Sequence, residues 1–230
     1  MLLHNPKAGS GKPSKRQLLA ALAEAGHEAS YASTKSKGWR KALKQKCDLV
    51  LVAGGDGTVG KVARELIGSR TPLSVLPTGT ANNLARTLGF IGPVDERIES
   101  LAENEPQGFD VALARGPWGE RWIFEGLGAG FFAEYLRRAD GCKERGKSKE
   151  EQMRRHIRRL LRLFSTYRAR SWDFALNDEN VSGRYLLWEG LNICSVGPVL
   201  PFAPDARTDD GRLDVVTARE AYRDLLVHYL

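Results

Sequence analysis

The chain has 230 residues, 42% of them hydrophobic, which is enough to bury a core in one large domain or two small ones and excludes disorder of the whole chain. The net charge of +7 and a pI of about 9.4 favour an anionic partner: nucleic acid, a phosphorylated metabolite or an acidic membrane surface. Cys47, Cys142 and Cys194 have no paired spacing, so reduced thiols and a cytoplasmic protein are expected. No apolar run approaches the roughly 20 residues that span a bilayer, so the sequence predicts a chain that is at most peripheral to a membrane.

The first 92 residues alternate short apolar runs with amphipathic segments, a pattern typical of a parallel sheet with helices on both faces. We therefore predict a doubly wound α/β domain over residues 1–92. The expected strands lie at residues 1–4, 28–31, 48–53 and 72–76, and the expected helices at 14–25, 38–46, 59–67 and 81–88.

After the break at Gly89 to Pro93 the pattern changes to strands with less helix between them. Strands are expected at residues 109–114, 121–124, 171–176, 185–196 and 213–217, and a helix at 218–230. The sequence thus predicts a second domain over residues 93–230, mainly antiparallel β.

One strong helix is predicted in this second half, at Glu150 to Tyr167, where apolar and basic residues recur on opposite faces. The apolar face holds Met153, Ile157, Leu160, Leu161 and Phe164, and the basic face Arg154, Arg155, Arg158, Arg159 and Arg162. Lys143 to Arg170 holds eleven Lys or Arg against three Glu, so the basic excess of the chain lies in this stretch. Such a segment fits docking on an anionic lipid surface, and it equally fits a solvated helix that packs on the sheet.

Three loops at the predicted carboxyl ends of strands carry the chemistry. The segment Gly54-Gly55-Asp56-Gly57-Thr58 follows an apolar strand and precedes a helical pattern, so its glycines would let backbone N–H groups approach a phosphate. Thr58 is expected to cap the following helix, and Asp56 to hold a metal or accept a proton. The other two loops are Asn5 to Lys12, which is rich in glycine and lysine, and Pro77 to Thr80.

Neither of these other loops is specific by itself. Gly11-Lys12 is followed by Pro13, where a Walker A loop requires Ser or Thr. The segment Pro77-Thr78-Gly79-Thr80 offers hydroxyls and backbone donors at a helix start, but many turns do so. Ligands of parallel sheets bind beyond the carboxyl ends of the strands, and all three loops are predicted there.

Taken together, the loops resemble the nucleotide-binding half of the diacylglycerol kinase catalytic family, which includes bacterial lipid kinases and sphingosine and ceramide kinases. The resemblance rests on Asn5-Pro6 with Gly9 and Gly11, on Gly54 to Thr58, on Gly79-Thr80 with Asn82 and Ala85, on Phe109-Asp110-Val111, on Gly126 to Gly130, and on Asp209-Asp210-Gly211-Arg212-Leu213-Asp214. The NAD kinases share the pentapeptide, but the Gly-Thr-x-Asn-x-x-Ala segment and the late Asp-Asp-Gly favour lipid kinases.

The resemblance implies ATP and Mg²⁺ as cofactors and transfer of the γ-phosphoryl group to a lipid hydroxyl, as in phospholipid metabolism. It also implies that the second domain, residues 93–230, binds the acceptor lipid. Asp56 is then the catalytic residue, as a magnesium ligand or as the base that deprotonates the acceptor alcohol. The implied nucleotide contacts are Asn5, Lys7, Thr34, Gly54, Gly55, Asp56, Gly57, Thr58, Val59, Gly60, Gly79, Thr80 and Asn82. A structural magnesium would bind the Asp210 carboxylate with the backbone carbonyls of Arg207 and Arg212.

The chain departs from the family pattern in three places. Gly60-Lys61 stands where relatives often have Asn-Glu, which adds a cation near the expected phosphates. Asn82-Asn83 stands where Asn-Asp is usual, so a carboxylate is lost at a helix start. The family's late Asp-Gly-Glu segment, whose acidic residues approach the acceptor hydroxyl, is not reached before Leu230. We therefore expect the second domain to be incomplete at its C-terminus, or the protein to be a shortened relative with impaired catalysis.

The leading hypothesis is an ATP-dependent lipid kinase with a diacylglycerol-like acceptor. Two alternatives stay open: a NAD kinase-like enzyme with a soluble substrate, and a nucleotide-binding regulatory relative that transfers no phosphate. Nucleic-acid binding is not expected, because the basic helix lacks interleaved aromatic residues on which bases could stack. Relatives are often dimers, so the resemblance also allows a homodimer, and the expected location is the cytoplasm, with peripheral attachment to the inner face of the membrane.

Overall fold

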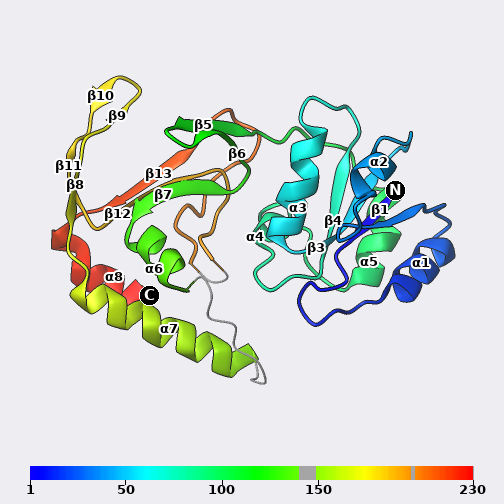
Figure 1. Ribbon diagram of the computed structural model, residues 1–230, viewed down its shortest axis with the longest axis horizontal. Helices are drawn as coiled ribbons and strands as arrows, with labels where there is room; N and C mark the ends of the chain where they lie inside the picture. Colours follow the sequence, from blue (N-terminus) through cyan, green and yellow to red (C-terminus); the bar gives the residue numbers. More distant parts are fainter. Residues whose placement is uncertain (140–148, 198–199, 230) are drawn as a thin grey trace. The chain divides into compact units, whose positions relative to one another are not determined.

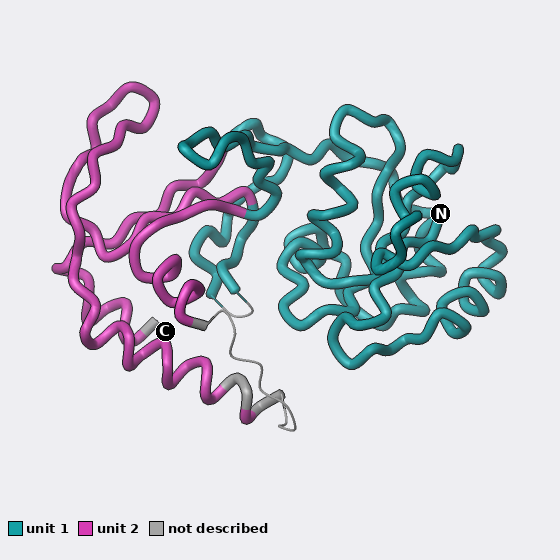
Figure 2. Tube along the Cα trace, viewed as in Figure 1, with its two compact units in different colours: residues 1–125, 193–212 teal, residues 126–192, 213–230 magenta. Residues whose placement is uncertain are grey.

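The computed structural model of the chain describes residues 1–139, 149–197 and 200–229. The chain forms two compact units, coloured separately in Figure 2: residues 1–125 with 193–212, and residues 126–192 with 213–230. We call them unit 1 and unit 2. Unit 1 thus includes residues 193–212, which follow most of unit 2 in the sequence. The predicted domain boundary between residues 92 and 93 stays a prediction.

Unit 1 is built on a four-stranded parallel sheet in the order β2-β1-β3-β4 (Figure 1). The strands are β1 (Leu2–His4), β2 (Tyr31–Ser33), β3 (Val50–Gly54) and β4 (Leu73–Pro77). The central strand β3 is buried along its whole length, as expected for a parallel strand with helices on both faces. The prediction of an α/β fold with a doubly wound parallel sheet is confirmed.

Two apolar cores cover the two faces of this sheet. Alternate strand residues such as Leu3 and Val52 pack with three helices: α2 (Trp39–Leu43), α3 (Asp56–Ala63) and α4 (Asn83–Thr87). Their neighbours Leu2 and Leu51 pack with two other helices: α1 (Lys15–Glu24) and α5 (Val94–Glu99). The alternation follows from the two-residue period of a strand. Short 3₁₀ helices, η1 (Arg64–Leu66) and η2 (Ser100–Ala102), follow α3 and α5.

The start of α1 shows how local sequence fixes a helix end. Ser14 caps the helix: its hydroxyl accepts from the Gln17 N–H at 3.4 Å, and the Gln17 side chain accepts from the Ser14 N–H at 2.9 Å. This reciprocal capping box satisfies two backbone donors that would otherwise lack partners. The predicted helix at 14–25 is therefore confirmed to within one residue at each end, whereas α5 was not predicted.

Unit 1 also contains an antiparallel hairpin of β5 (Ala112–Gly116) and β6 (Gly119–Ile123). Phe124, directly after this hairpin, and Ile193, at the start of the returning segment, join the core that contains α3 and α4. The returning segment is tied back by a hydrogen bond from the Asp110 N–H to the Thr208 carbonyl at 2.6 Å. These contacts explain why residues 193–212 belong to unit 1.

Unit 2 is centred on a three-stranded antiparallel sheet in the order β13-β12-β7. Its strands are β7 (Gly126–Gly130), β12 (Leu187–Leu191) and β13 (Asp214–Ala218). Two further antiparallel pairs join β8 (Arg170–Trp172) to β11 (Gly183–Tyr185) and β9 (Ala175–Leu176) to β10 (Glu179–Asn180). The helical elements are α6 (Phe131–Ala139), α7 (Lys149–Thr166), η3 (Glu220–Tyr222) and α8 (Arg223–Tyr229). The prediction of antiparallel strands in the second half is confirmed.

The core of unit 2 is aromatic. Phe131, fully buried at the start of α6, packs edge-on against Phe164 of α7 at 4.8 Å between ring centroids and against Tyr167 at 5.7 Å. The Phe131 N–H donates to the Leu186 carbonyl at 2.9 Å. As Figure 1 shows, α6 therefore lies between the sheet and α7.

The amphipathic pattern of α7 is confirmed. Leu163 and Phe164 are buried, whereas Arg158 and Arg162 are exposed. The predicted start at Glu150 and end at Tyr167 differ from α7 by one residue. The side chain of Met153 and the basic residues 143–148 lie outside the described part of the chain.

Several predicted strands were wrong in extent. The run 171–176 is split between β8 and β9, and the run 185–196 ends as a strand at Leu191. Strand β7 was not predicted, because a glycine-rich run carries no β-branched or alternating signature. Helix α6 was not predicted either. Among the helices in the described ranges, none is long and apolar enough to cross a bilayer.

Candidate active site

The three glycine-containing loops meet at the carboxyl ends of β1, β3 and β4. The Asn5 side-chain amide donates to the Thr58 hydroxyl at 2.9 Å, which ties the first loop to the second. The Thr78 N–H donates to the Gly54 carbonyl at 3.2 Å, which ties the third loop to the second. The sequence prediction that these loops come together is thus met by direct hydrogen bonds.

Two glycines allow this close approach. A Cβ on Gly79 would lie 2.3 Å from the Cα of Gly55, so neither loop could carry a side chain at that crossing. Gly9 has a φ of +53°, and a Cβ there would lie 2.3 Å from the Thr78 carbonyl oxygen. Backbone therefore faces backbone across all three loops, which is the arrangement in which N–H groups can surround an anion.

Helix α3 begins earlier than its sequence pattern indicated. Its first residue is Asp56 and its N-cap is Gly55, so Thr58 lies in the first turn. The prediction that Thr58 caps this helix was wrong: its hydroxyl instead accepts from Asn5, and its N–H donates to the Gly55 carbonyl at 2.8 Å. The backbone N–H groups in the first turn of α3, a helix of eight residues, therefore lie where the three loops meet.

The rest of the predicted segment runs along α3. Gly57 is exposed, the Val59 side chain is buried in the core and Gly60 lies in the second turn, so only the backbone of Val59 and Gly60 could meet a ligand. The Lys61 ammonium does not point to the loops. It donates to the Thr34 carbonyl at 3.3 Å and lies 4.9 Å from the centre of the Trp39 ring.

The other predicted nucleotide contacts lie around the same junction. Thr34 is buried after β2, and its hydroxyl donates to the His4 carbonyl at 3.3 Å. Lys7 and Thr80 have exposed side chains. Asn82 adopts the left-handed conformation at φ 53°, and its side chain accepts from the Gly79 N–H at 2.9 Å and donates to the Gly79 carbonyl at 3.1 Å. Asn82 therefore shapes the third loop.

Asp56 connects the glycine segment to α4. One carboxylate oxygen accepts from the backbone N–H of Leu84, in the first turn of α4, at 3.0 Å. An acceptor at a helix start satisfies a donor that has no partner within the helix. The half-buried carboxylate is thereby fixed in orientation beside the loops.

A second carboxylate, which the sequence reasoning missed, belongs to the same site. Glu125 follows β6, is half-buried and hydrogen bonds to the side chain of the buried Asn83. Burial, with a smaller contribution from the charge of Asp56, raises the pKa of Glu125 to about 7, against the lowering effect of Asn83. Its only sequence signature was a carboxylate directly after the strand residues Ile123 and Phe124. At position 83, where the family pattern has a carboxylate, this chain has an amide that bonds to the Glu125 carboxylate.

The third loop also contains a buried hydroxyl without a partner. Thr78 is 9% exposed, and its Oγ1 has no hydrogen-bond partner within the described residues. Buried polar groups in proteins are nearly always satisfied, so an orphaned hydroxyl among glycine loops is consistent with a missing polar ligand.

These features fit a magnesium nucleotide. Backbone donors at a helix N-terminus and an unpaired hydroxyl suit phosphate oxygens. Proteins usually hold Mg²⁺ by one or two carboxylates together with substrate phosphates, and Asp56 and Glu125 are two carboxylates that could do so. Within the described ranges, no group of three or more His, Cys, Asp or Glu side chains is placed to hold a metal without such a co-ligand.

The acidic turn near residue 210 lies in unit 1 and contacts Asp110. The Asp110 carboxylate accepts from the Gly211 N–H at 2.6 Å. Asp210 accepts from the Arg212 N–H at 3.0 Å, and Asp209 forms an ion pair with Arg207 at 3.2 Å. The structural magnesium site at Asp210, Arg207 and Arg212 stays a prediction.

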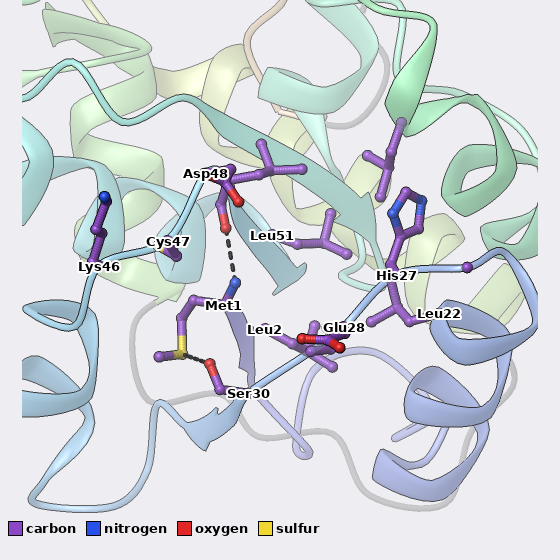
Figure 3. A pocket seen from close by; sticks show the side chains of 14 residues that line it. Met1, Leu2, Leu22, His27, Glu28, Ser30, Lys46, Cys47, Asp48 and Leu51 are labelled. Atoms are coloured by element: carbon purple, nitrogen blue, oxygen red, sulfur yellow. Dashed lines mark hydrogen bonds between the residues drawn. The ribbon is translucent and has the colours of Figure 1, made fainter.

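A cavity of about 670 Å³ occupies the opposite, amino-terminal edge of the unit 1 sheet (Figure 3). It is lined by residues that precede the strands, including Met1, Ser30 and Asp48. The Met1 amino group donates to the Leu49 carbonyl at 2.8 Å, and the Ser30 hydroxyl lies 3.5 Å from the Met1 sulfur. Since the glycine loops and Asp56 lie at the other edge, this cavity is not the predicted nucleotide site.

Comparison with known proteins identifies related sequences. The family described as "Diacylglycerol kinase catalytic domain" matches residues 1–114. A diacylglycerol kinase of Bacillus subtilis is 25% identical over 229 residues, covering 96% of this chain and 73% of its own length. A Pseudomonas aeruginosa protein named as a YegS-like lipid kinase is 28% identical over 228 residues, covering 94% of this chain and 70% of its own.

The fold has a solved counterpart. The crystal structure of a diacylglycerol kinase from Bacillus anthracis strain Sterne superposes with a TM-score of 0.73, covering 99% of this chain and 78% of that one. At 23% sequence identity this likeness establishes the fold alone.

Proposed function

Because residues 1–114 place the chain in the family of the diacylglycerol kinase catalytic domain, we propose that it is an ATP-dependent lipid kinase. The transferred group is the γ-phosphoryl of ATP, and the acceptor is the hydroxyl of a diacylglycerol-like lipid. The relatives carry the names diacylglycerol kinase and lipid kinase, which support a kinase of this class.

The observation that carries the proposal is the junction of the three loops around Asp56. Phosphoryl transfer requires positioning and neutralisation of charge more than covalent chemistry by the protein. The helix start at Gly55 and Asp56, the backbone crossing at Gly79 and the Thr78 hydroxyl together offer donors to phosphate oxygens. The proposed nucleotide contacts are those that the sequence predicted around this junction, with Thr78 added.

Asp56 and Glu125 are the proposed ligands of Mg²⁺. When bound, the ion neutralises charge on the phosphates during transfer. The Leu84 N–H holds the Asp56 carboxylate, and Asn83 holds that of Glu125, so both donors are oriented before a ligand arrives. When two carboxylates lie close together, the charge of each makes ionisation of the other less favourable, and a cation bound by both removes this penalty. The Asp210 turn with the carbonyls of Arg207 and Arg212 is proposed as a second, structural magnesium site.

Unit 2 is the proposed membrane-facing part of the enzyme. The exposed arginines of α7, including Arg158 and Arg162, would meet anionic headgroups at the inner face of the membrane, where each basic group contributes about 1 kcal/mol. Such peripheral attachment by a cytoplasmic enzyme, as a homodimer or a monomer, suits a substrate that stays in the bilayer.

The proposal is tested by transfer of labelled γ-phosphate from Mg-ATP in mixed micelles. Acceptors are diacylglycerol, ceramide, a sphingoid base, phosphatidylglycerol and undecaprenol, with NAD as the soluble control. Labelling of a lipid, and none of NAD, is the expected result. Labelling of NAD alone would identify a NAD kinase-like enzyme. ATP binding without transfer to any acceptor would identify a nucleotide-binding relative.

A further inference from the structure

Glu189 is a buried carboxylate in the middle of the unit 2 sheet. It lies on β12, the central strand, and only 7% of its surface is exposed. Glutamate is almost never buried to this degree unless it is paired. The residue therefore requires a physical explanation.

Its carboxyl group has no partner of its own within the described residues. Neither a hydrogen bond nor an ion pair reaches it, and burial alone raises its pKa to about 7. Its oxygens are not among the fully buried side-chain atoms that lack a partner, so the carboxyl group keeps an opening to the surface beside the exposed Gly128. A largely buried carboxyl group with such an opening and no protein partner can accept a hydrogen bond from a ligand.

The glycines of the neighbouring strand leave room for this carboxyl group, which lies against Gly128. Gly126, Gly128 and Gly130 of β7 lie opposite Leu191, Glu189 and Leu187 of β12, so this row of glycines shares one sheet face with Glu189. A Cβ on Gly128 would lie 1.9 Å from a carboxylate oxygen of Glu189. Only glycine admits the carboxyl group at this place, and Gly128 itself is exposed.

The surroundings define the chemistry of a ligand. On the same face, Leu187 and Leu191 stand before and after Glu189 and are 1% and 3% exposed. A glycine strand beside them lets a ligand approach the backbone closely. One hydrogen-bonding group between apolar neighbours matches a molecule with a single hydroxyl on an apolar body. A metal ion is not favoured, because the described residues offer no set of ligands around Glu189.

We propose that Glu189 and the glycine row of β7 form an acceptor subsite, in which the Glu189 carboxyl group accepts a hydrogen bond from the hydroxyl of the lipid. This inference rests on the proposed lipid kinase function and adds a specificity residue to it. Glu189 forms no covalent bond and acts by binding the lipid hydroxyl.

The test combines kinetics with stability in three variants of the full chain. Glu189→Leu removes the acceptor group, Glu189→Gln keeps a carbonyl oxygen in its place, and Glu179→Gln changes an exposed glutamate of the same unit as the control. In mixed micelles, Glu189→Leu should raise the KM for diacylglycerol about tenfold, the loss expected for one hydrogen bond, and leave the KM for ATP unchanged.

The two other variants should stay near the wild-type KM. The Tm of Glu189→Leu should be unchanged or higher, because an unpaired buried carboxyl group is removed. An unchanged KM for diacylglycerol in Glu189→Leu would overturn the inference, and so would a rise of equal size in the KM for ATP. If Glu189→Leu fails to fold, a normal KM in Gly128→Ala, whose Cβ displaces the carboxyl group, overturns it as well.

A binding assay separates this inference from the proposed function. Phosphatidylcholine vesicles with diacylglycerol are compared with vesicles in which its hydroxyl is capped as a methyl ether. The wild type should bind the first more tightly and Glu189→Leu should not distinguish them, even if the wild type transfers no phosphate. Equal binding of the wild type to both vesicles would overturn the acceptor subsite.

Discussion

Glu125 links the electrostatics of the site to its proposed metal. Replacement by Gln keeps the size and the contact with Asn83 but removes one of two carboxylates beside the loops. We expect Glu125→Gln to raise the Mg²⁺ concentration needed for half-maximal ATP binding by about tenfold, since such second carboxylates are commonly worth one to two orders of magnitude in metal affinity. Calorimetric titration of ATP at a series of Mg²⁺ concentrations measures this without reference to turnover. An unchanged Mg²⁺ dependence would remove Glu125 from the site.

Gly79 and Gly57 provide a matched pair within the loops. Gly79→Ala places a Cβ 2.3 Å from the Gly55 backbone, so we expect a loss of at least about 2 kcal/mol in the free energy of unfolding. Gly57 lies exposed in α3 with no atom within 4 Å of an added Cβ, so Gly57→Ala should stabilise by about 0.5–1 kcal/mol. Urea denaturation of both variants measures their free energies of unfolding. Equal effects would contradict the packing of the second and third loops.

The buried carboxyl group of Glu189 gives the folded state a defined pH dependence. Its pKa is raised from an ordinary 4.5 to about 7, so the folded protein binds this proton more tightly than the unfolded chain. The stabilising contribution is complete below about pH 4.5 and is lost as the pH rises through 7, with a size of about 3 kcal/mol. Because Glu125 titrates in the same window, Glu189→Gln should show a smaller decline than the wild type, whereas Glu179→Gln should keep the full decline. A decline of equal size in both variants would contradict the assignment.

Helix α7 has a basic face whose role can be separated from its packing. The double variant Arg158→Glu and Arg162→Glu changes only exposed residues, so the fold should persist while binding to phosphatidylglycerol vesicles falls at least about 30-fold. Arg64→Glu with Arg70→Glu, also exposed but in unit 1, makes the same change in net charge and is the control. Binding of the wild type to these vesicles should weaken progressively as the salt concentration is raised, because salt screens the exposed charges. Equal losses in both double variants would show that net charge, and not α7, decides binding.

The elements that follow strong periodicity were predictable, and those that depend on glycine were not. The four parallel strands and α7 have apolar residues at regular spacing, and both were found near their predicted places. Strand β7 consists mainly of glycine, so only its pairing with β12 makes it a strand. Helix α3 begins at Asp56, inside the segment Gly54 to Thr58, where its N-terminus lies beside the other two loops. Helix propensity reflects local sequence and does not report such a tertiary arrangement.

The site was predictable to the extent that its residues are adjacent in sequence. Asp56 and the glycine loops could be placed because strands of a parallel sheet end at the same edge. Glu125 could not, because it reaches Asn83 from a hairpin 42 positions further along the chain, and nothing in the intervening sequence indicates that contact. Glu189 carries no motif, and only its burial opposite Gly128 distinguishes it.

The division of the chain into two units also depends on contacts between residues far apart in sequence, which the sequence pattern did not predict. Composition changes near residue 93, yet unit 1 extends to residue 125 and takes back residues 193–212. Ile193 is fully buried among the residues of α3 and α4, and Thr208 accepts from Asp110. Pairings of such long sequence separation leave no local pattern. Unit 1 thus holds both the loops around Asp56 and the acidic turn at Asp209 and Asp210.

The central claim, that the loop junction around Asp56 is a lipid kinase site, is tested most directly by one comparison. Asn at position 56 can still accept from the Leu84 N–H, so Asp56→Asn should keep the fold while losing the carboxylate. The initial rate of γ-phosphate transfer from Mg-ATP to diacylglycerol is measured for both proteins, with thermal unfolding as the check on folding. We predict transfer by the wild type and at least about a thousandfold lower rate, about 4 kcal/mol in the barrier, for Asp56→Asn with an unchanged Tm. Equal rates in the two proteins would contradict the account.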